Sequence, residues 1–116
     1  MKSDQLLKLA VEATENKKAE DIISLNMKGI SDMTDYFVVC HGNNENRFNQ
    51  LHVQLKTSLT KQKLKLSVWK LNEARWILID LANVVVHVFH KDERDYYNIE
   101  KLYRDAPLES YRQVVY

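Results

Sequence analysis

Two residues with the chemistry of an acid–base pair, Asp80 and His87, lie close together in this sequence. They belong to two runs rich in β-branched and aromatic residues, Trp76–Asp80 and Val84–Phe89, which predict two strands. The short connection Leu81–Asn83 predicts an antiparallel hairpin, with both polar side chains on one face and their Cα atoms about 7–8 Å apart. Aspartate can orient histidine as a general base. A triad also needs a nucleophile, and neither strand offers a serine or cysteine on that face. We therefore favour the interpretation that both are polar members of a surface patch.

Metal and phosphate chemistry receives little support from the sequence. With only two glycines, the chain has neither a P-loop nor a dinucleotide fingerprint. His87 and His90 are three residues apart on one strand and are predicted to point to opposite faces. Glu93 and Asp95 have the spacing of a paired-carboxylate metal site, but they fall in a predicted helix, where such side chains diverge. The single cysteine, Cys40, is predicted to be a buried, inert thiol. We expect no metal and no cofactor, which disfavours the enzymatic alternative, a metal-dependent nucleotidyltransferase.

The hairpin is predicted to be the centre of a mixed sheet with helices packed on it. In chain order, the expected elements are a helix from about Ser3 to Asn16, strands over Ile22–Met27 and Tyr36–His41, a helix over about Glu45–Gln62, a strand over Leu64–Trp69, the two hairpin strands, and a helix over about Asp92–Arg104. This order, αββαβββα, predicts an α/β (α+β) fold with a sheet of about five strands. Residues 1–107 are expected to form a single domain. Residues 108–116 form a C-terminal tail of uncertain structure, in which Val114–Tyr116 is either a short strand or disordered.

The two faces of the hairpin predict different roles. If the turn centres on Ala82 and Asn83, the facing pairs are Asp80 with Val85, Leu78 with His87, and Trp76 with Phe89. One face is wholly aliphatic and is expected to pack against the core: Ile77, Ile79, Val84, Val86 and Val88. The other face mixes large apolar groups with two polar ones. It is either a docking surface or is covered by the last helix, and covering is expected for Phe89 more than for Trp76.

Composition limits the classes of partner. The chain has 116 residues with 17 basic and 16 acidic side chains, a formal net charge of +1. A protein that binds RNA through its phosphates usually has a clear excess of basic residues. Because this excess is missing here, a protein or small-molecule partner is favoured. The sequence shows no apolar run near the ~20 residues of a membrane span and no signal-peptide pattern. We expect a cytoplasmic protein without a membrane partner.

Four parts of the chain together carry a family resemblance. They are Asp35–Cys40 with Gly42, Arg75–Asp80, Val84–Phe89, and Arg94–Leu102 with Asp105–Pro107. These segments resemble the Iojap/RsfS family of ribosomal silencing factors over about residues 3–107. The sequence departs from the family pattern at Tyr103, where a tryptophan is common, and in the turn Leu81–Asn83, which lacks a glycine. The resemblance implies a nucleotidyltransferase-like α/β fold without transferase activity.

The resemblance also implies a function and partners. Such a factor binds a protein of the large ribosomal subunit, the L-fourteen protein, at the intersubunit face and sterically blocks subunit joining, which represses translation when nutrients are limiting. A homodimer is compatible with it, and a secondary contact with ribosomal RNA could involve the lysines at positions 56, 61, 63, 65 and 70. The candidate partner-binding residues are Trp76, Leu78, Asp80 and His87 on the hairpin, with the acidic Glu73 and Glu100 able to meet a basic ribosomal protein.

Overall fold

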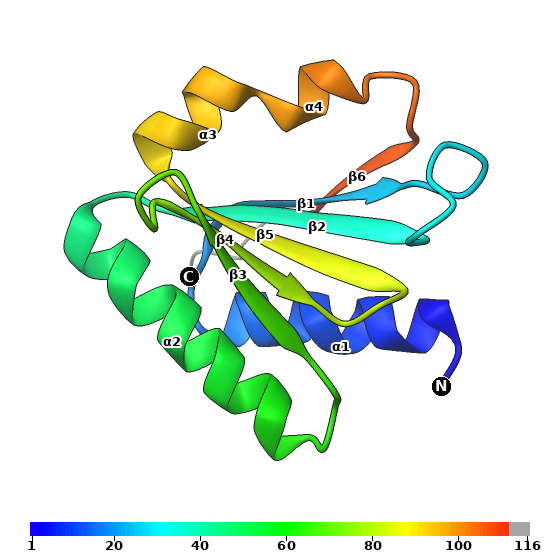
Figure 1. Ribbon diagram of the computed structural model, residues 1–116, viewed down its shortest axis with the longest axis horizontal. Coiled ribbons are helices and arrows are strands. Elements are labelled where there is room, and N and C mark those ends of the chain that lie inside the picture. The colour runs from blue at the N-terminus through cyan, green and yellow to red at the C-terminus, as the bar shows by residue number, and fades with distance from the viewer. Residues whose placement is uncertain (112–116) are drawn as a thin grey trace.

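The structure is a computed structural model that describes residues 1–111, which form one mixed sheet with helices on both faces (Figure 1). In chain order the elements are α1 (Ser3–Asn16), β1 (Glu20–Asn26), β2 (Tyr36–Gly42), α2 (Glu45–Lys61), β3 (Ser67–Leu71), β4 (Trp76–Asp80), β5 (Val84–His90), α3 (Lys91–Tyr97), α4 (Ile99–Leu102) and β6 (Leu108–Tyr111). The predicted α/β (α+β) class is confirmed. The sheet has six strands among the described residues, one more than expected.

The strands lie in the order β3-β4-β5-β2-β1-β6. β2 and β5 are parallel and central, and the other neighbours are antiparallel. The predicted hairpin register is confirmed, because Asp80 pairs with Val85, Leu78 with His87, and Trp76 with Phe89. The turn between these strands contains Ala82, whose φ of 71° lies in the left-handed region.

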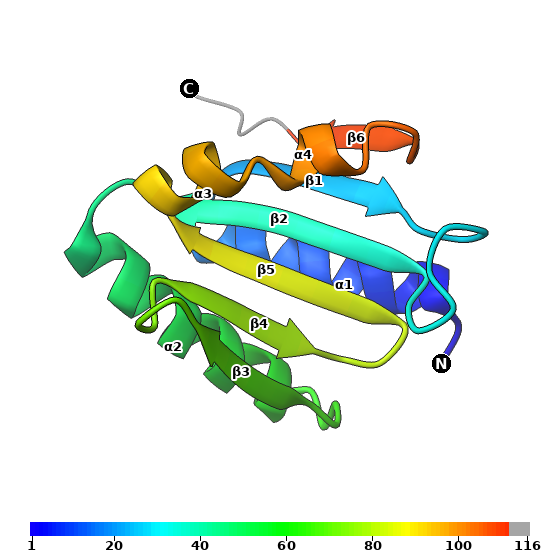
Figure 2. The ribbon, with the colours of Figure 1, turned by 45° about the horizontal axis from the view of Figure 1, so that its top comes forward.

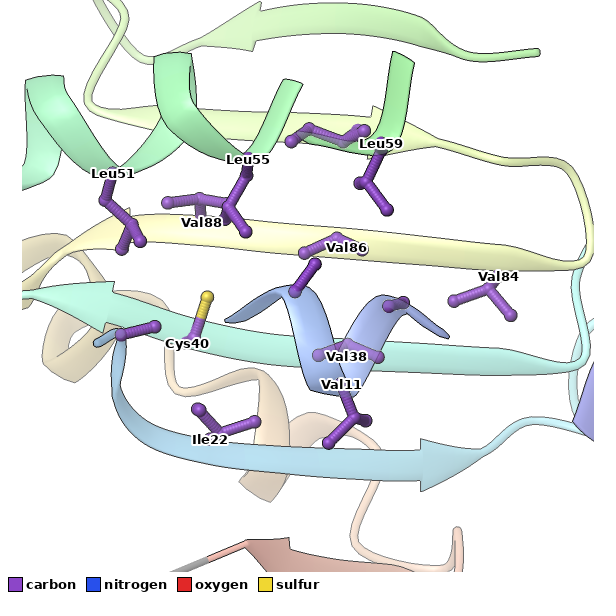
Figure 3. Packing of buried hydrophobic residues seen from close by; sticks show 14 of the residues in the cluster. Val11, Ile22, Val38, Cys40, Leu51, Leu55, Leu59, Val84, Val86 and Val88 are labelled. Atoms are coloured by element: carbon purple, nitrogen blue, oxygen red, sulfur yellow. The ribbon is translucent and has the colours of Figure 1, made fainter. Parts of the chain in front are cut away.

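The helices α1 and α2 cover one face of the sheet and form the main core with it (Figure 3). Apolar residues three or four apart on α2 point toward the aliphatic side chains of β5, as expected for an amphipathic helix. The aliphatic hairpin face predicted to pack inward is fully buried here: Ile77, Ile79, Val84, Val86 and Val88. Asn44 begins α2 by accepting a hydrogen bond from the Arg47 N–H at 2.8 Å.

The helices α3 and α4 lie on the opposite face, where they cover only part of the sheet. Figure 2 shows them running along the β1–β2 side, whereas β3 and β4 carry no helix on this face in the described part of the chain. A second apolar cluster lies beneath the two helices and includes Val39, Phe89 and Ile99. The expectation that Phe89 is covered is confirmed, and it is fully buried. Trp76 is half-buried at the boundary between the covered and the open part.

Two sequence predictions about element boundaries were wrong, and the structure adds one strand in the tail whose structure the sequence left open. The third strand covers Ser67–Leu71 instead of Leu64–Trp69, because its register follows the pairing with β4 and not the alternation of leucines before it. The last helix is divided at Asn98, whose φ of 46° is left-handed, so the expected Asp92–Arg104 helix is two short helices. Residues Leu108–Tyr111 form β6 beside β1, which adds the sixth strand. Val114–Tyr116 lies outside the described residues.

Candidate docking site

The open part of the sheet presents the side chains of β3 and β4 that face away from α2. Cross-strand pairing places Trp69 opposite Leu78, Leu71 opposite Trp76, and Ser67 opposite Asp80, so each pair shares a face. We call these six residues the open sheet face. Trp69 is 58% exposed and Leu71 is 37% exposed, while Trp76, Leu78 and Asp80 are half-buried. Large apolar side chains at such exposure form the type of surface that binds a partner.

Trp76 is held rigidly at one end of this face. Its ring stacks on Phe89 with a centroid distance of 4.9 Å and packs against Tyr97 at the same distance. Its indole Nε1–H donates a hydrogen bond to Nδ1 of His87 at 3.2 Å. An aromatic side chain fixed on three sides loses little conformational freedom when a partner binds, which favours its use as an anchor.

A hollow of about 570 Å³ lies at the other end of the open sheet face. Its apolar wall is formed by Phe37, Leu66, Leu78 and Val85. The polar residues that line it are Ser31, Thr34, Lys65, Ser67, Asp80 and His87. An apolar wall with a few polar groups is typical of a pocket that receives a ligand or a side chain of a partner.

His87 is buried against this hollow and stays uncharged. The side chain is 5% exposed, and burial lowers the pKa of His87 to about 3. The ring of Phe37 lies edge-on to the imidazole at 4.4 Å. Among residues 1–111, no hydrogen-bond partner contacts the Nε2 atom. His87 is therefore a neutral polar group, unable to supply positive charge to a partner near neutral pH.

Asp80 and His87 share a face, but each is hydrogen-bonded elsewhere. Oδ1 of Asp80 accepts a hydrogen bond from the Ala82 N–H at 2.8 Å and so holds the left-handed turn. Nδ1 of His87 is occupied by the Trp76 indole. A carboxylate that orients a general base must contact the imidazole itself. The geometry favours the interpretation of both residues as polar members of a surface patch.

The structure does not bring the acidic residues Glu73 and Glu100 to the hollow. Glu73 is exposed in the β3–β4 turn, at the opposite end of the hairpin from Asp80. Glu100 lies on α4 and pairs with the buried Arg94 at 3.6 Å between Oε1 and Nε. Glu100, Arg94 and His41 line a separate cavity of about 570 Å³. Any contact that Glu73 and Glu100 make with a partner would lie at the edges of the molecule.

The separate cavity is lined by an internally bonded network. The Arg94 guanidinium lies 2.9 Å from Nδ1 of His41, and Asn43 lies 3.0 Å from the Nε2 atom of the same ring. Burial, followed by the Arg94 charge, lowers the pKa of His41. Arg94 also donates to the Glu20 carbonyl oxygen at 3.4 Å. These bonds tie α3 to the ends of β1 and β2, which gives the network a structural role.

Two further residues with potential chemistry, Cys40 and His90, are buried in the structure. Cys40 is buried, and burial raises the pKa of its thiol to about 12, so the expected inert thiol is confirmed. The ring centroid of His90 lies 6.3 Å from that of Phe48 on α2, so His90 is on the face opposite to His87, as predicted.

Within residues 1–111, no group of three His, Cys, Asp or Glu side chains could hold a metal ion. In that part of the chain no helix has both the length and the apolarity needed to cross a membrane.

Sequence reasoning missed Trp69 and Leu71 as site residues. The predicted strand Leu64–Trp69 ended at Trp69 and left Leu71 out, and neither residue was a candidate for partner binding, although both lie on the open sheet face. The available signal was the alternation that places Trp69 on the same strand face as the polar Lys65 and Ser67. It became interpretable only once the β3–β4 register placed it beside Leu78.

The comparisons with known proteins agree on one family. The family model described as ribosomal silencing factor during starvation (RsfS) matches residues 1–115. A ribosomal silencing factor from Halalkalibacterium halodurans is 51% identical over 108 residues, covering 92% of this chain and 92% of that protein. One from Bacillus subtilis is 47% identical, covering 93% and 92%. A crystal structure of a Chromobacterium violaceum protein superposes with a TM-score of 0.80 at 30% identity, covering 88% of this chain and 86% of that one.

Proposed function

This chain belongs to the ribosomal silencing factor (RsfS) family, and we propose from this premise that it binds the L-fourteen protein on the intersubunit face of the large ribosomal subunit. In that position the domain occupies the space that the small subunit needs, so the subunits do not join and translation falls. The family description refers to starvation, and we propose that the protein acts when nutrients are limiting. Its place of action is the cytoplasm.

The open sheet face is the observation that carries this proposal. It presents the exposed Trp69 beside the half-buried Trp76 and Leu78, on strands that the core holds rigid. Aromatic side chains near the centre of an interface usually supply most of the binding energy. A protein that acts by occupying a surface needs such a patch and needs no catalytic group. The hollow beside Leu78 adds a socket for a side chain or loop of the partner.

Charged residues around this face support specificity and approach. Asp80 is half-buried in the hollow, and a basic ribosomal protein would meet its charge there. Lys65 is exposed at the same hollow, and the lysines at positions 56, 61, 63 and 70 are also exposed. This basic strip is suited to a secondary contact with ribosomal RNA. A second copy of the chain could occupy the open sheet face in the free protein and would then compete with the ribosome.

Co-sedimentation with purified large subunits tests the docking surface. Trp69→Ala removes an exposed anchor, and we expect its affinity to fall at least tenfold, because truncating an interface hot spot costs about 2 kcal/mol or more and about 1.4 kcal/mol is tenfold. Asp80→Asn removes the charge but keeps an oxygen for the Ala82 N–H, so the turn should persist while association slows. Tyr96→Ala is the matched control, because Tyr96 is 81% exposed on α3 and lies outside the open sheet face.

A subunit-joining experiment then tests the consequence of docking. Small and large subunits are mixed with the wild-type protein or with the Trp69→Ala variant, and the joined ribosomes are measured on a sucrose gradient. Wild type and Tyr96→Ala should reduce joining, and Trp69→Ala should not. If Trp69→Ala binds and blocks joining as wild type does, while its thermal melt is unchanged, the docking surface lies elsewhere.

A further inference from the structure

The hydrogen-bond pattern of His87 determines its tautomer. The indole of Trp76 is a donor only, so Nδ1 of His87, 3.2 Å away, must be the acceptor and carries no proton. Because the ring is neutral, its one proton is on Nε2. Trp76, on the neighbouring strand, therefore fixes His87 as a hydrogen-bond donor through Nε2.

That donor is unused in the free protein. Among residues 1–111 the Nε2 atom has no hydrogen-bond partner and is shielded from water. Buried polar groups are nearly always hydrogen-bonded, and an exception calls for an explanation in terms of function or a missing partner. Here the imidazole lines the hollow next to the open sheet face. The unsatisfied donor and the hollow thus occur at the surface where docking is proposed.

We propose that the docking partner inserts a neutral carbonyl oxygen, from a backbone or an amide side chain, into this hollow, where it accepts the His87 Nε2–H. The inference rests on the proposed function and specifies the chemistry of the same surface. The ring of Phe37 lies 4.4 Å from the imidazole and also lines the hollow. Because Nε2 is shielded in the free protein, binding requires side chains around it to shift, and the half-buried Phe37 ring is the one of these that both contacts the imidazole and lines the hollow.

The surroundings of His87 select a neutral acceptor. A cationic lysine or arginine group has only donors and cannot bond an N–H. A carboxylate could accept, but it would enter a hollow that already holds the Asp80 carboxylate, and like charges at short distance repel. Apolar walls from Leu66, Leu78 and Val85 suit the uncharged carbon atoms that flank a carbonyl group.

Binding of the isolated L-fourteen protein, measured by calorimetry, tests the role of the donor. His87→Phe keeps an aromatic ring but removes Nε2–H together with Nδ1, the acceptor of the Trp76 indole, and it leaves the partner oxygen without a donor. We expect the dissociation constant to rise roughly tenfold. His87→Gln restores an N–H near the Nε2 position and should recover part of the affinity. Trp69→Ala reports the docking surface independently of the donor.

Nuclear magnetic resonance of the wild-type protein gives a second readout that does not depend on how a variant folds. In the free protein, Nε2 of His87 should be protonated and Nδ1 unprotonated. On adding the L-fourteen protein, the Nε2–H proton should exchange more slowly with water and shift as it enters a hydrogen bond, and the Phe37 ring resonances should move. An unprotonated Nε2, or a proton unaffected by the partner, overturns the proposal even if the Phe variant fails to fold.

The outcomes separate this inference from the proposed function. If Trp69→Ala weakens binding and His87→Phe does not, docking stands and the carbonyl acceptor is wrong. If neither variant weakens binding, the docking surface itself is wrong and the inference falls with it. If His87→Phe weakens binding, His87→Gln recovers part of it and the wild-type Nε2–H responds to the partner, the inference is supported.

Discussion

At the scale of single residues, His87 links protein stability to pH. The buried imidazole is neutral in the folded protein, where its pKa is about 3, while an unfolded histidine has a pKa of about 6.5. Between these two values the unfolded chain binds a proton that the folded protein excludes. Stability from His87 is therefore fully present above about pH 6.5 and is lost as the pH falls toward 3.

The low pKa of His87 predicts that the wild type is more sensitive to acid than the His87→Phe variant. When the pH falls from 7.5 to 5, the free energy of unfolding of the wild type should drop by about 2 kcal/mol because of His87. In the His87→Phe variant this drop should be smaller by the same amount. His41, whose pKa is also lowered by burial, contributes in the same direction in both proteins and cancels in the comparison. Urea unfolding at the two pH values measures the difference. Parallel losses in both proteins would show that His87 is not the group excluded from protonation.

The sequence predicted that Asp80 and His87 share one face of the hairpin, but it did not predict their hydrogen bonds. The alternation of residues in Trp76–Asp80 and Val84–Phe89 is enough to place Asp80 and His87 on one side. The Trp76–His87 hydrogen bond depends on side-chain rotamers, which have no signature in residue spacing. The suspected acid–base pair was resolved only by seeing which atoms each group contacts.

At the scale of elements, one residue, Asn98, divides the expected last helix into two short helices. Asn98 adopts a left-handed conformation between α3 and α4. Its N–H donates to the Arg94 carbonyl oxygen at 2.9 Å, and its side chain accepts from the Lys101 N–H at 3.2 Å. Asparagine tolerates this conformation better than other residues with a Cβ. A helical pattern with no glycine or proline at the break did not reveal it in the sequence.

We expect substitutions at Asn98 to follow backbone preference over helix propensity. Asn98→Ala should destabilise the protein by about 2 kcal/mol, because alanine suffers the left-handed strain and loses the cap. Asn98→Gly loses only the cap and should cost less than about 1 kcal/mol. Chemical denaturation ranks the three proteins. If alanine were the most stable of the three, the predicted continuous helix would be the better description of this segment.

The turn between β2 and α2 is constrained in a different way. A Cβ atom at Gly42 would lie 2.6 Å from the Phe48 backbone nitrogen and 2.7 Å from its Cα, so the first turns of α2 would have to move. Gly29 has a φ of 81° but open space around it. We expect Gly42→Ala to cost about 3 kcal/mol and Gly29→Ala about 1 kcal/mol in a thermal melt. Equal costs would mean that α2 adjusts freely, contrary to its packing on β5.

At the scale of the whole molecule, strand order is the property that local sequence patterns determine least. The pattern supplied strand and helix types in nearly the right order, but β5 pairs with β2 across more than 40 residues of chain and β6 returns to β1. Long-range pairing depends on which faces fit once the helices have packed. The short, polar sequence of β6, Leu-Glu-Ser-Tyr, lacks the apolar run that identifies a strand, so only its partner β1 makes it one.

The pairing of β6 predicts how the molecule behaves when that strand is removed. Truncation after Pro107 removes the partners of Ile22–Leu25 and the Tyr111 hydroxyl, which lies 2.9 Å from the Ser24 hydroxyl. The exposed edge of β1 then offers unpaired backbone groups to another chain. Truncation after Tyr111 is the matched control, because it keeps β6. We expect the shorter chain to melt at a lower temperature and to self-associate in light scattering after size-exclusion chromatography. If both truncations melt and elute alike, β6 contributes nothing to the stability of the sheet and does not protect the edge of β1.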